Sequence, residues 1–480
     1  MSKDDYEARL PKLRAGLLDA QFRLRSSQRP VIIIVTGADG AGKGDVMHRL
    51  NEWLDPRGID TQAFWLSSDE EDERPPYWRF WRVLPARGRI GVFFGTWYTR
   101  PIVRHLAGKL KNRELDAALD RIAGFEKMLA DDGAVIIKLW LHLSQAEQAQ
   151  RFRDVEKNPE KHWRILPTDW QGSKLHSRFR ELSERALRHT DSAAAPWQVI
   201  EAGDDRYRDL TVGETVLGAL QAALARKFAT AAKVEKKRAP VANGVTVLQR
   251  VDLSQALGEE DYARKLEKFQ AKLNRLAWAM YEKRRSTVLV FEGWDAAGKG
   301  SSIRRVAEAI DPRLFRIIPV ASPTDEERAH HYLWRFWRHL PRGGMIRIYD
   351  RSWYGRVLVE RVEGYAREDE WRRAYREIND FEEQLVEDGM VVGKFWIHIS
   401  KEEQLRRFKN REQISFKRYK ITPDDWRNRK KWDAYGAAVT EMVRRTSTQS
   451  APWTLVAGND KKFARIQILK TICRSLEEVL

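Results

Sequence analysis

The stretch Ser286–Ser302, S-T-V-L-V-F-E-G-W-D-A-A-G-K-G-S-S, has the pattern of a strand, a glycine-rich loop and a helix. The apolar run Val288–Phe291 is rich in β-branched and aromatic residues, which predicts a buried strand. A glycine loop follows, and a helical pattern begins at Ser301. In such a loop the backbone N–H groups turn toward one anion, while a lysine and the helix N-terminus add positive charge. We therefore predict that this loop binds phosphate.

The predicted loop residues share small size or positive charge, and they are Gly293, Gly298, Lys299, Gly300 and Ser301. Gly300 stands where many phosphate loops carry the Ser or Thr that holds magnesium. A carboxylate, Asp295, lies inside the loop instead. If a metal is used, its protein ligands should be acidic, and Asp295 should be one of them. A glycine turn with an incidental lysine is the alternative reading.

A repeat argues against that alternative. A second glycine loop, with Lys43 in place of Lys299, lies 256 residues earlier. The same offset relates further pairs without a gap, among them Trp78–Arg82 and Trp334–Arg338, Trp97-Tyr98 and Trp353-Tyr354, and Pro196-Trp197 and Pro452-Trp453. The chain is therefore a tandem duplication, which a chance loop would not bring with it.

The repeat and the length of 480 residues predict two domains. We expect an N-terminal domain at 1–228, a small and charged linker at 229–250, and a C-terminal domain at 251–480. In the second copy the pattern predicts helices at 258–284, 301–310 and 325–340, with further helices to about Glu387. The predicted strands lie at 288–291, 315–320, 345–350, 391–399 and 453–456. The predicted fold is α/β, with a parallel sheet flanked by helices, and ligands should bind outside the carboxyl ends of its strands.

Composition limits the partners and the compartment. The net charge of +18 indicates a polyanionic partner, which charge alone does not identify among nucleic acid, nucleotides and phosphate polymers. A single cysteine, Cys473, excludes an internal disulfide and is typical of the cytoplasm. No apolar segment approaches membrane-spanning length, and the first residues lack the pattern of a signal peptide.

A second candidate group lies at the end of the predicted strand 345–350. Asp350 ends that strand beside the loop strand, where phosphoryl-transfer enzymes place a magnesium ligand. Arg351 and Arg356 follow and are suited to neutralise and orient phosphate oxygens. Alternatively, Asp350 caps the next turn and the arginines form surface ion pairs. The phosphate loop in the same copy makes this alternative the weaker interpretation.

A basic segment at 406–420 is the third candidate. Seven basic residues face one acid there, a density that favours a phosphate-binding lid over a solvated helix face. The expected lid and polyanion contacts are Arg406, Arg407, Lys409, Arg411, Lys417, Arg418 and Lys420.

The two copies differ where chemistry is expected. The offset places Phe94 at the position of Asp350 and Gly95 at that of Arg351. Without these groups the first copy would hold metal poorly, so we predict catalysis by the C-terminal copy alone. The N-terminal copy would have a structural role or help to bind a long anion. The duplication also suggests an internal pseudo-dimer, and it leaves a homo-oligomer open.

The motifs G-W-D-A-A-G-K-G, Y-D-R-S-W-Y-G-R-V-L-V-E and the basic lid leading to T-P-D-D-W closely resemble the second family of polyphosphate kinases. The resemblance covers nearly the whole chain, once per copy, as in the two-domain polyphosphate:AMP phosphotransferases. It implies a P-loop kinase core like that of thymidylate kinase, Mg²⁺ as cofactor, and transfer of phosphate from inorganic polyphosphate to AMP, giving ADP. It assigns the transferring phosphates to Lys299, the metal and the acceptor phosphate to Asp295 and Asp350, and the nucleotide phosphate to Arg351 and Arg356.

Three other functions are alternatives to this interpretation. A polyphosphate:ADP phosphotransferase shares these motifs, and only its acceptor pocket differs. An ATP-dependent nucleotide kinase fits the heavily basic lid less well. A non-enzymatic nucleic-acid-binding protein would suit the charge, but no module of that kind is recognisable, and we expect neither nucleic acid nor membrane as a partner.

Overall fold

The computed structural model describes residues 1–157, 176–226, 246–414 and 421–480 and contains two compact units. Unit 1 comprises Met1–Ser67, Arg79–Thr230 and Thr324–His331. Unit 2 comprises Ser68–Trp78, Ala231–Pro323 and Tyr332–Leu480. The predicted boundaries at 228 and 251 stay a prediction, because each unit also contains a segment of the other repeat copy.

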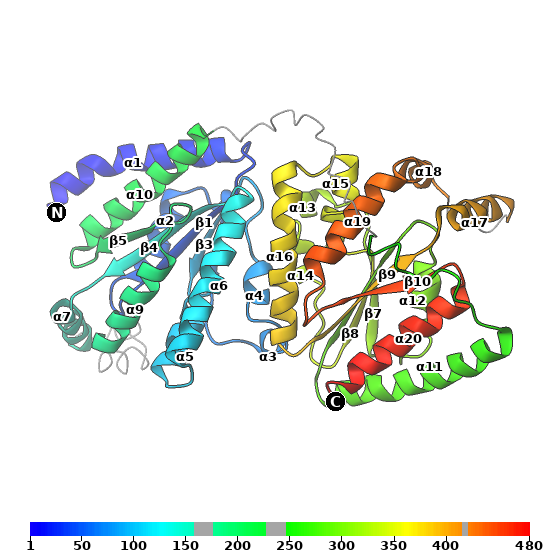
Figure 1. Ribbon diagram of the computed structural model, residues 1–480. Coiled ribbons are helices and arrows are strands. Elements are labelled where there is room, and N and C mark those ends of the chain that lie inside the picture. Colours follow the sequence, from blue (N-terminus) through cyan, green and yellow to red (C-terminus); the bar gives the residue numbers. More distant parts are fainter. Residues whose placement is uncertain (158–175, 227–245, 415–420) are drawn as a thin grey trace. The chain divides into compact units, whose positions relative to one another are not determined.

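Both copies form the same order of five strands with similar intervening helices (Figure 1). The first copy contains α1(Lys3–Leu24), β1(Val31–Gly37), α2(Lys43–Trp53), η1(Pro56–Gly58), β2(Ile59–Ala63), α3(Asp69–Asp72), α4(Trp78–Trp81), β3(Ile90–Phe94), α5(Thr99–Leu106), α6(Asn112–Asp131), β4(Val135–His142), α7(Gln145–Glu156), α9(His176–Thr190), β5(Trp197–Glu201) and α10(Asp205–Ala225). The second copy contains α11(Glu259–Glu282), β6(Thr287–Gly293), α12(Lys299–Ala307), β7(Phe315–Pro319), α13(Asp325–Arg328), α14(Trp334–Trp337), β8(Ile346–Asp350), η3(Trp353–Arg356), α15(Val359–Glu363), α16(Glu368–Glu387), β9(Val391–His398), α17(Lys401–Gln413), α18(Pro423–Lys430), α19(Trp432–Thr446), β10(Trp453–Ala457) and α20(Lys461–Glu477).

Each unit is built on a parallel five-stranded sheet. The strand orders are β2-β3-β1-β4-β5 and, equivalently, β7-β8-β6-β9-β10, so the loop strand is central in both. Helices cover both faces; in unit 2, α12 and α20 lie on one face and α16 and α19 on the other (Figure 1). The predicted α/β fold, with a parallel sheet duplicated in tandem, is confirmed.

The central strands are apolar because both faces of the sheet are covered. In unit 2, the side chains of Val288, Leu289, Val290 and Phe291 are at most 2% exposed. In unit 1, Val31, Ile33 and Val35 of β1 belong to one core cluster with residues of α1, α2 and α10. Among the described residues, none of the helices combines the length and the apolar run that crossing a bilayer requires.

The helix predicted at 325–340 is wrong. The structure has two one-turn helices there, α13 and α14, separated by residues 329–333. Residues 324–331 belong to unit 1, while the chain from Tyr332 onward belongs to unit 2. The interruption at 329–333 therefore contains the point, between His331 and Tyr332, at which the chain passes from unit 1 to unit 2.

Candidate active site

The phosphate loop of unit 2 connects the central strand to the first turn of α12. Gly298, with a φ of 113°, directly precedes this helix. A side chain at Gly293 would come within 2.6 Å of the carbonyl oxygen of Ile397, so only glycine permits this close approach to β9. Nζ of Lys299 donates a hydrogen bond to the carbonyl oxygen of Gly293 at 2.8 Å. Lys299 therefore lies along the loop, and it forms no ion pair with Asp295.

The two remaining loop residues have different environments. Oγ of Ser301 donates to the carbonyl oxygen of Gly298 at 2.9 Å, which closes the first turn of the helix. At Gly300 no atom lies within 4 Å of the position that a Cβ would take. Packing therefore does not require glycine at this position, and any metal ligand has to come from residues elsewhere in the site.

Asp295 and Asp350 lie at the same edge of the sheet. Asp350 is the last residue of β8 and pairs in register with Phe291 of β6. Nη2 of Arg351, the next residue, lies 3.5 Å from Oδ1 of Asp295. The other carboxylate oxygen of Asp295 accepts a hydrogen bond from Nδ2 of Asn428 at 2.9 Å. The structure thus brings the loop carboxylate together with Arg351, the residue that follows the strand-end carboxylate.

A buried glutamate supports this strand end. Arg351 has a left-handed backbone, with a φ of 65°, which costs a non-glycine residue on the order of 1 kcal/mol. Oγ of Ser352 donates to Oε1 of Glu292 at 2.9 Å and so links the strained turn to β6. Glu292 is 5% exposed, and this burial raises its pKa to about 7. Sequence reasoning missed Glu292, although an acid inside an apolar strand just before Gly293 was an available signal.

Arg356 lies apart from these contacts. Its Nε is 3.2 Å from Glu360, and its Nη1 is 3.9 Å from Glu370. The guanidinium also lies 4.5 Å from the centre of the Tyr332 ring. None of these partners belongs to the phosphate loop, so a role for Arg356 in binding the nucleotide phosphate stays a prediction.

Arg407 of the predicted lid is a brace beneath the phosphate loop. It is 5% exposed, and Nη1 donates to the carbonyl oxygens of Ala296 at 3.0 Å and Ala297 at 2.7 Å. Nη2 donates to the carbonyl oxygens of Gly458 at 2.6 Å and Asn459 at 2.9 Å. Burial lowers the pKa of Arg407. Because its donors are bonded to carbonyl groups, this placement favours a structural role over direct contact with a polyanion.

Three other predicted lid residues lie on α17. Arg406 is exposed and pairs with Glu403, and Lys409 is exposed on α17. Arg411 is half-buried near the end of the same helix. The last three predicted lid residues, Lys417, Arg418 and Lys420, lie outside the described residues. Contact of the lid with a polyanion stays a prediction.

The segment after the lid carries further residues that sequence reasoning missed. Oδ1 of Asn428 lies 3.2 Å from the hydroxyl of Tyr435, which in turn lies 3.3 Å from Glu363. Glu363 pairs with Lys431 at 2.8 Å. This network connects α18 and α19 to the loop carboxylate through Asn428. The sequence offered little signal, because single polar residues in a charged segment do not indicate their partners.

Aromatic stacking makes a second connection between this segment and the loop. The rings of Trp294 and Trp432 stack at 3.7 Å with an angle of 9° between their planes. Nε1 of Trp294 donates to Nδ1 of His398 at 2.9 Å, and burial lowers the pKa of His398 to about 4. His398 therefore remains neutral and accepts this hydrogen bond. The loop and the start of α19 are held together by apolar contact as well as by hydrogen bonds.

The phosphate loop of the first copy has a different electrostatic state. Nζ of Lys43 lies 2.9 Å from Oδ1 of Asp39, so the loop's own carboxylate neutralises its lysine. Asp45 stands at the position of the loop serine and adds negative charge to the first turn of α2. Phe94 and Gly95 replace the strand-end carboxylate and arginine. Each change makes this loop a poorer anion site.

The carboxylates of unit 2 fit a magnesium ion. Across 1–157, 176–226, 246–414 and 421–480, no group of three His, Cys, Asp or Glu residues is placed to hold a metal. Magnesium in phosphoryl-transfer enzymes is usually bound by one or two carboxylates together with water and substrate phosphates, so a third protein ligand is not needed. A magnesium site made by Asp295 and Asp350 with water and substrate phosphates would therefore need no further protein ligand, and the role of these two residues as metal ligands stays a prediction.

Comparison with known proteins places this geometry in a family. The sequence profile described as polyphosphate kinase 2 matches residues 1–227 and again residues 256–479. A relative from Pseudomonas aeruginosa, a polyphosphate:AMP phosphotransferase, is 51% identical over 99% of this chain and 97% of its own length. Another polyphosphate:AMP phosphotransferase, from Acinetobacter johnsonii, is 37% identical over 97% of this chain and 96% of its own length. A crystal structure of a polyphosphate kinase 2 from Pseudomonas aeruginosa is 48% identical and covers 100% of this chain and 97% of its own, with a TM-score of 0.90.

Proposed function

Because the chain belongs to the polyphosphate kinase 2 family, we propose that it is a polyphosphate:AMP phosphotransferase whose reaction takes place in the C-terminal copy. It transfers the terminal phosphate of inorganic polyphosphate to AMP and releases ADP. The observation that carries this proposal is that Arg351, which follows Asp350, lies beside the loop carboxylate Asp295, while Lys299 forms no ion pair with that carboxylate; in the first copy Lys43 pairs with Asp39, and Gly95 stands in place of Arg351. The choice of AMP is supported by relatives that share the duplicated chain over nearly its full length.

The residues of the site have separable roles in this reaction. The N–H groups of the loop and Lys299 bind the polyphosphate end, and Arg351 neutralises charge on the phosphate that is transferred. Asp295 and Asp350 would hold Mg²⁺, which when bound neutralises phosphate charge and orients its oxygens. A phosphate oxygen of AMP attacks the terminal phosphorus, whose bond to the bridging oxygen breaks, and the shortened polyphosphate leaves. AMP is already anionic near neutral pH, so placement and charge neutralisation suffice without a strong general base.

Two other acceptor and donor pairs are the alternatives. A polyphosphate:ADP phosphotransferase would use the same loop and carboxylates and would make ATP. An ATP-dependent nucleotide kinase would use a nucleotide as donor, for which the basic segment at 406–420 carries more charge than is needed.

The deciding experiment incubates the full-length protein with Mg²⁺ and each of three substrate pairs: polyphosphate with AMP, polyphosphate with ADP, and ATP with AMP. The products are separated by ion-exchange chromatography and quantified. We expect ADP from the first pair at the highest rate. ATP from ADP without ADP from AMP would replace this proposal by the ADP-specific alternative, and a requirement for ATP would reject polyphosphate as donor.

The same proposal covers partners and compartment. Polyphosphate accounts for the net charge of +18, so we propose no nucleic acid and no membrane as partners. Filter binding with DNA and polyphosphate in competition tests this, with retention of polyphosphate expected. A single cysteine supports a cytoplasmic location. A homo-oligomer stays open, and light scattering of the purified protein measures it.

A further inference from the structure

Each unit contains a short segment from the other repeat copy. Residues Ser68–Trp78 belong to unit 2 and residues Thr324–His331 belong to unit 1. We call them the first arm and the second arm. The 256-residue offset relates one arm to the other, and each begins with a one-turn helix closed by a capping box. The exchange is therefore reciprocal.

Charged side chains hold the first arm in unit 2. Glu73 is 12% exposed and forms ion pairs with both Arg284 and Arg342. The hydrogen bond from Arg342 lowers the pKa of Glu73. The side chain of Arg74, which is 8% exposed, donates from Nε to the carbonyl oxygen of Leu340 at 3.3 Å. Two adjacent arm residues thus anchor the segment, one by charge and one by a buried hydrogen bond.

Glu73 joins the two chain segments that lead into the catalytic strands. Arg284 precedes β6, and Arg342 precedes β8. Oγ of Ser286 donates to the carbonyl oxygen of Arg342 at 2.7 Å, so the two segments are also in direct contact. Arg284 has a left-handed backbone with a φ of 53°, which needs contacts to hold it. The opposite ends of the same strands carry the phosphate loop and Asp350.

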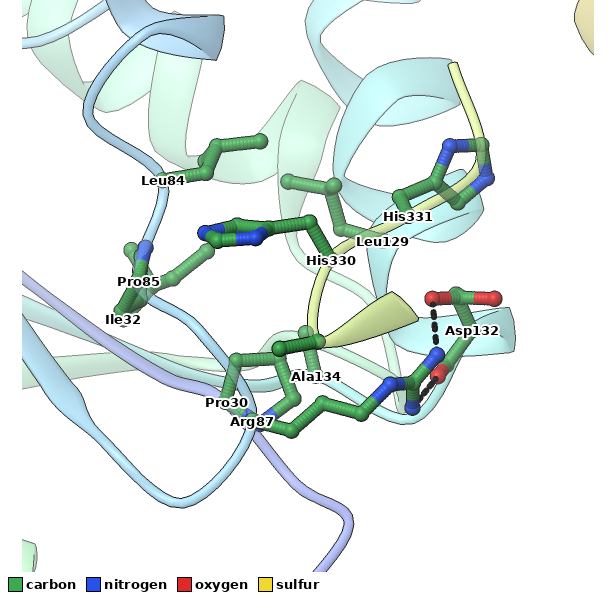
Figure 2. A pocket seen from close by; sticks show the side chains of 11 residues that line it. Pro30, Ile32, Leu84, Pro85, Arg87, Leu129, Asp132, Ala134, His330 and His331 are labelled. Carbon is green, nitrogen blue, oxygen red and sulfur yellow. Dashed lines mark hydrogen bonds and ion pairs between the residues drawn. The ribbon is translucent and has the colours of Figure 1, made fainter. Parts of the chain in front are cut away.

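The second arm occupies the equivalent place in unit 1 by different contacts. The backbone N–H of Arg87 donates to the carbonyl oxygen of Ala329 at 2.8 Å. Figure 2 shows the His330 ring in a pocket beside Leu84, with Arg87 bonded to Asp132 along its edge. The pocket residues Pro30, Asp132 and Ala134 correspond by the offset to Ser286, Asp388 and Met390, which line the cleft around the first arm.

We propose that the first arm is a structural part of the catalytic unit, in which Glu73 clamps the starts of β6 and β8. The first copy has lost the strand-end carboxylate, yet it still contributes these residues to the sheet that carries the active site. Arg284 and Arg342 correspond by the offset to Gln28 and Ala86, and Glu73 corresponds to Ala329, so these three positions do not form such a clamp in unit 1. This clamp gives the N-terminal copy a role that does not depend on its own phosphate loop.

A double-mutant cycle on the full chain tests the clamp. Glu73→Ala, Arg342→Ala and the double variant are compared by thermal unfolding and by hydrogen exchange at 285–289 and 343–347. Each single change should lower the melting temperature of unit 2 by roughly 2–4 °C, and the double variant should lose little more than one single variant. Exchange should accelerate at both strand starts. Additive losses, or unchanged exchange at these strands, would overturn the proposal.

Two further variants remove ambiguity. Glu73→Lys opposes both arginines and should lower stability further, while addition of Arg342→Glu should restore part of the loss; failure to restore it would also reject the clamp. Glu308→Ala, which removes the exposed pair with Arg305 on α12, is the matched control and should show no coupling to Arg342. The catalytic role of unit 2 rests on the proposed function, but these readouts do not use activity, so the two can fail separately.

Discussion

The two phosphate loops share a backbone and differ in charge. Both loop lysines donate to carbonyl groups of their own loop, but Lys43 also pairs with Asp39 at 2.9 Å, whereas Asp295 contacts Arg351 and Asn428 instead of Lys299. The loop carboxylate therefore pairs with the loop lysine in the first copy and not in the second. Possession of the loop motif does not establish activity, because the side chains around it decide whether its lysine is available.

A buried network shows that this difference is local. Lys138 pairs with Glu126 at 2.8 Å and donates to the carbonyl oxygen of Thr190, and in the second copy Lys394 pairs with Glu382 at 2.7 Å. Both ion pairs are almost fully buried, and breaking such a pair costs about 3–5 kcal/mol. The unchanged network maintains the fold, while the residues at the edge of the sheet have diverged.

The largest effect should come from the strand-end carboxylate. Asp350→Asn keeps the size of the side chain but removes its charge, and we expect kcat/KM for polyphosphate and AMP to fall by about 10²–10³-fold. The matched change in the first copy, Phe94→Asp, should leave the rate within about twofold, because the loop lysine there stays paired. Steady-state kinetics measure both variants. A change in kcat/KM of similar size from Phe94→Asp would contradict the inference that only the C-terminal copy is catalytic.

The brace under the loop should matter for stability more than for substrate affinity. Arg407→Ala leaves four carbonyl groups without this donor and should lower the free energy of unfolding of unit 2 by about 2–4 kcal/mol. Arg151, which donates to Gly40 and Ala202 in the first copy, is the counterpart, and Arg151→Ala should destabilise unit 1 in the same way. Denaturant unfolding measures both. A raised KM for polyphosphate with unchanged stability would instead support direct contact by Arg407.

The buried glutamate should add a pH dependence of stability at a position that carries no titratable group in the first copy. Below about pH 4.5 Glu292 is neutral in folded and unfolded chains; above it the unfolded chain ionises first, so stability falls until pH approaches the folded pKa of about 7. Glu292→Gln should remove this decline, which amounts to on the order of 3 kcal/mol. Unfolding at pH 5 and pH 8 measures it. Thr36 occupies this position in the first copy and does not titrate, so it adds no such dependence of stability on pH. An equal loss of stability from pH 5 to pH 8 in the wild type and in Glu292→Gln would contradict the raised pKa of Glu292.

The smallest effect should come from the residue that orients the loop carboxylate. Asn428→Ala removes one hydrogen bond to Asp295, worth about 1 kcal/mol, so the rate should fall about three- to tenfold. Asn410→Ala, on the exposed side of α17, is the control and should leave the rate unchanged. Kinetics with varied Mg²⁺ concentration would show the loss. Equal rates for the two variants would mean that Asn428 does not position Asp295.

Much of the fold followed from the sequence because its signals are local or repeated. The apolar strand, the glycine loop and the 256-residue offset predicted the parallel sheet, its duplication and the position of Asp350 beside the loop. The helix expected at 325–340 was wrong, because unit membership changes within it and local periodicity does not report on that.

The supporting residues were harder to predict. Arg407 stands in a basic run that resembles a solvent-facing lid, and only the folded chain shows that its guanidinium lies under the loop. Glu292 and Asn428 act through partners that are 60 and 133 residues away in sequence. Pairings over such distances leave no periodic pattern in one sequence.

The most direct measurement compares alanine variants of the two loop lysines in the full-length protein, with ADP formed from polyphosphate and AMP as the readout. We expect Lys299→Ala to lower kcat/KM by about 10²–10³-fold and Lys43→Ala to keep it within about twofold. Loss of turnover in Lys43→Ala with wild-type turnover in Lys299→Ala would contradict the assignment of catalysis to the C-terminal copy.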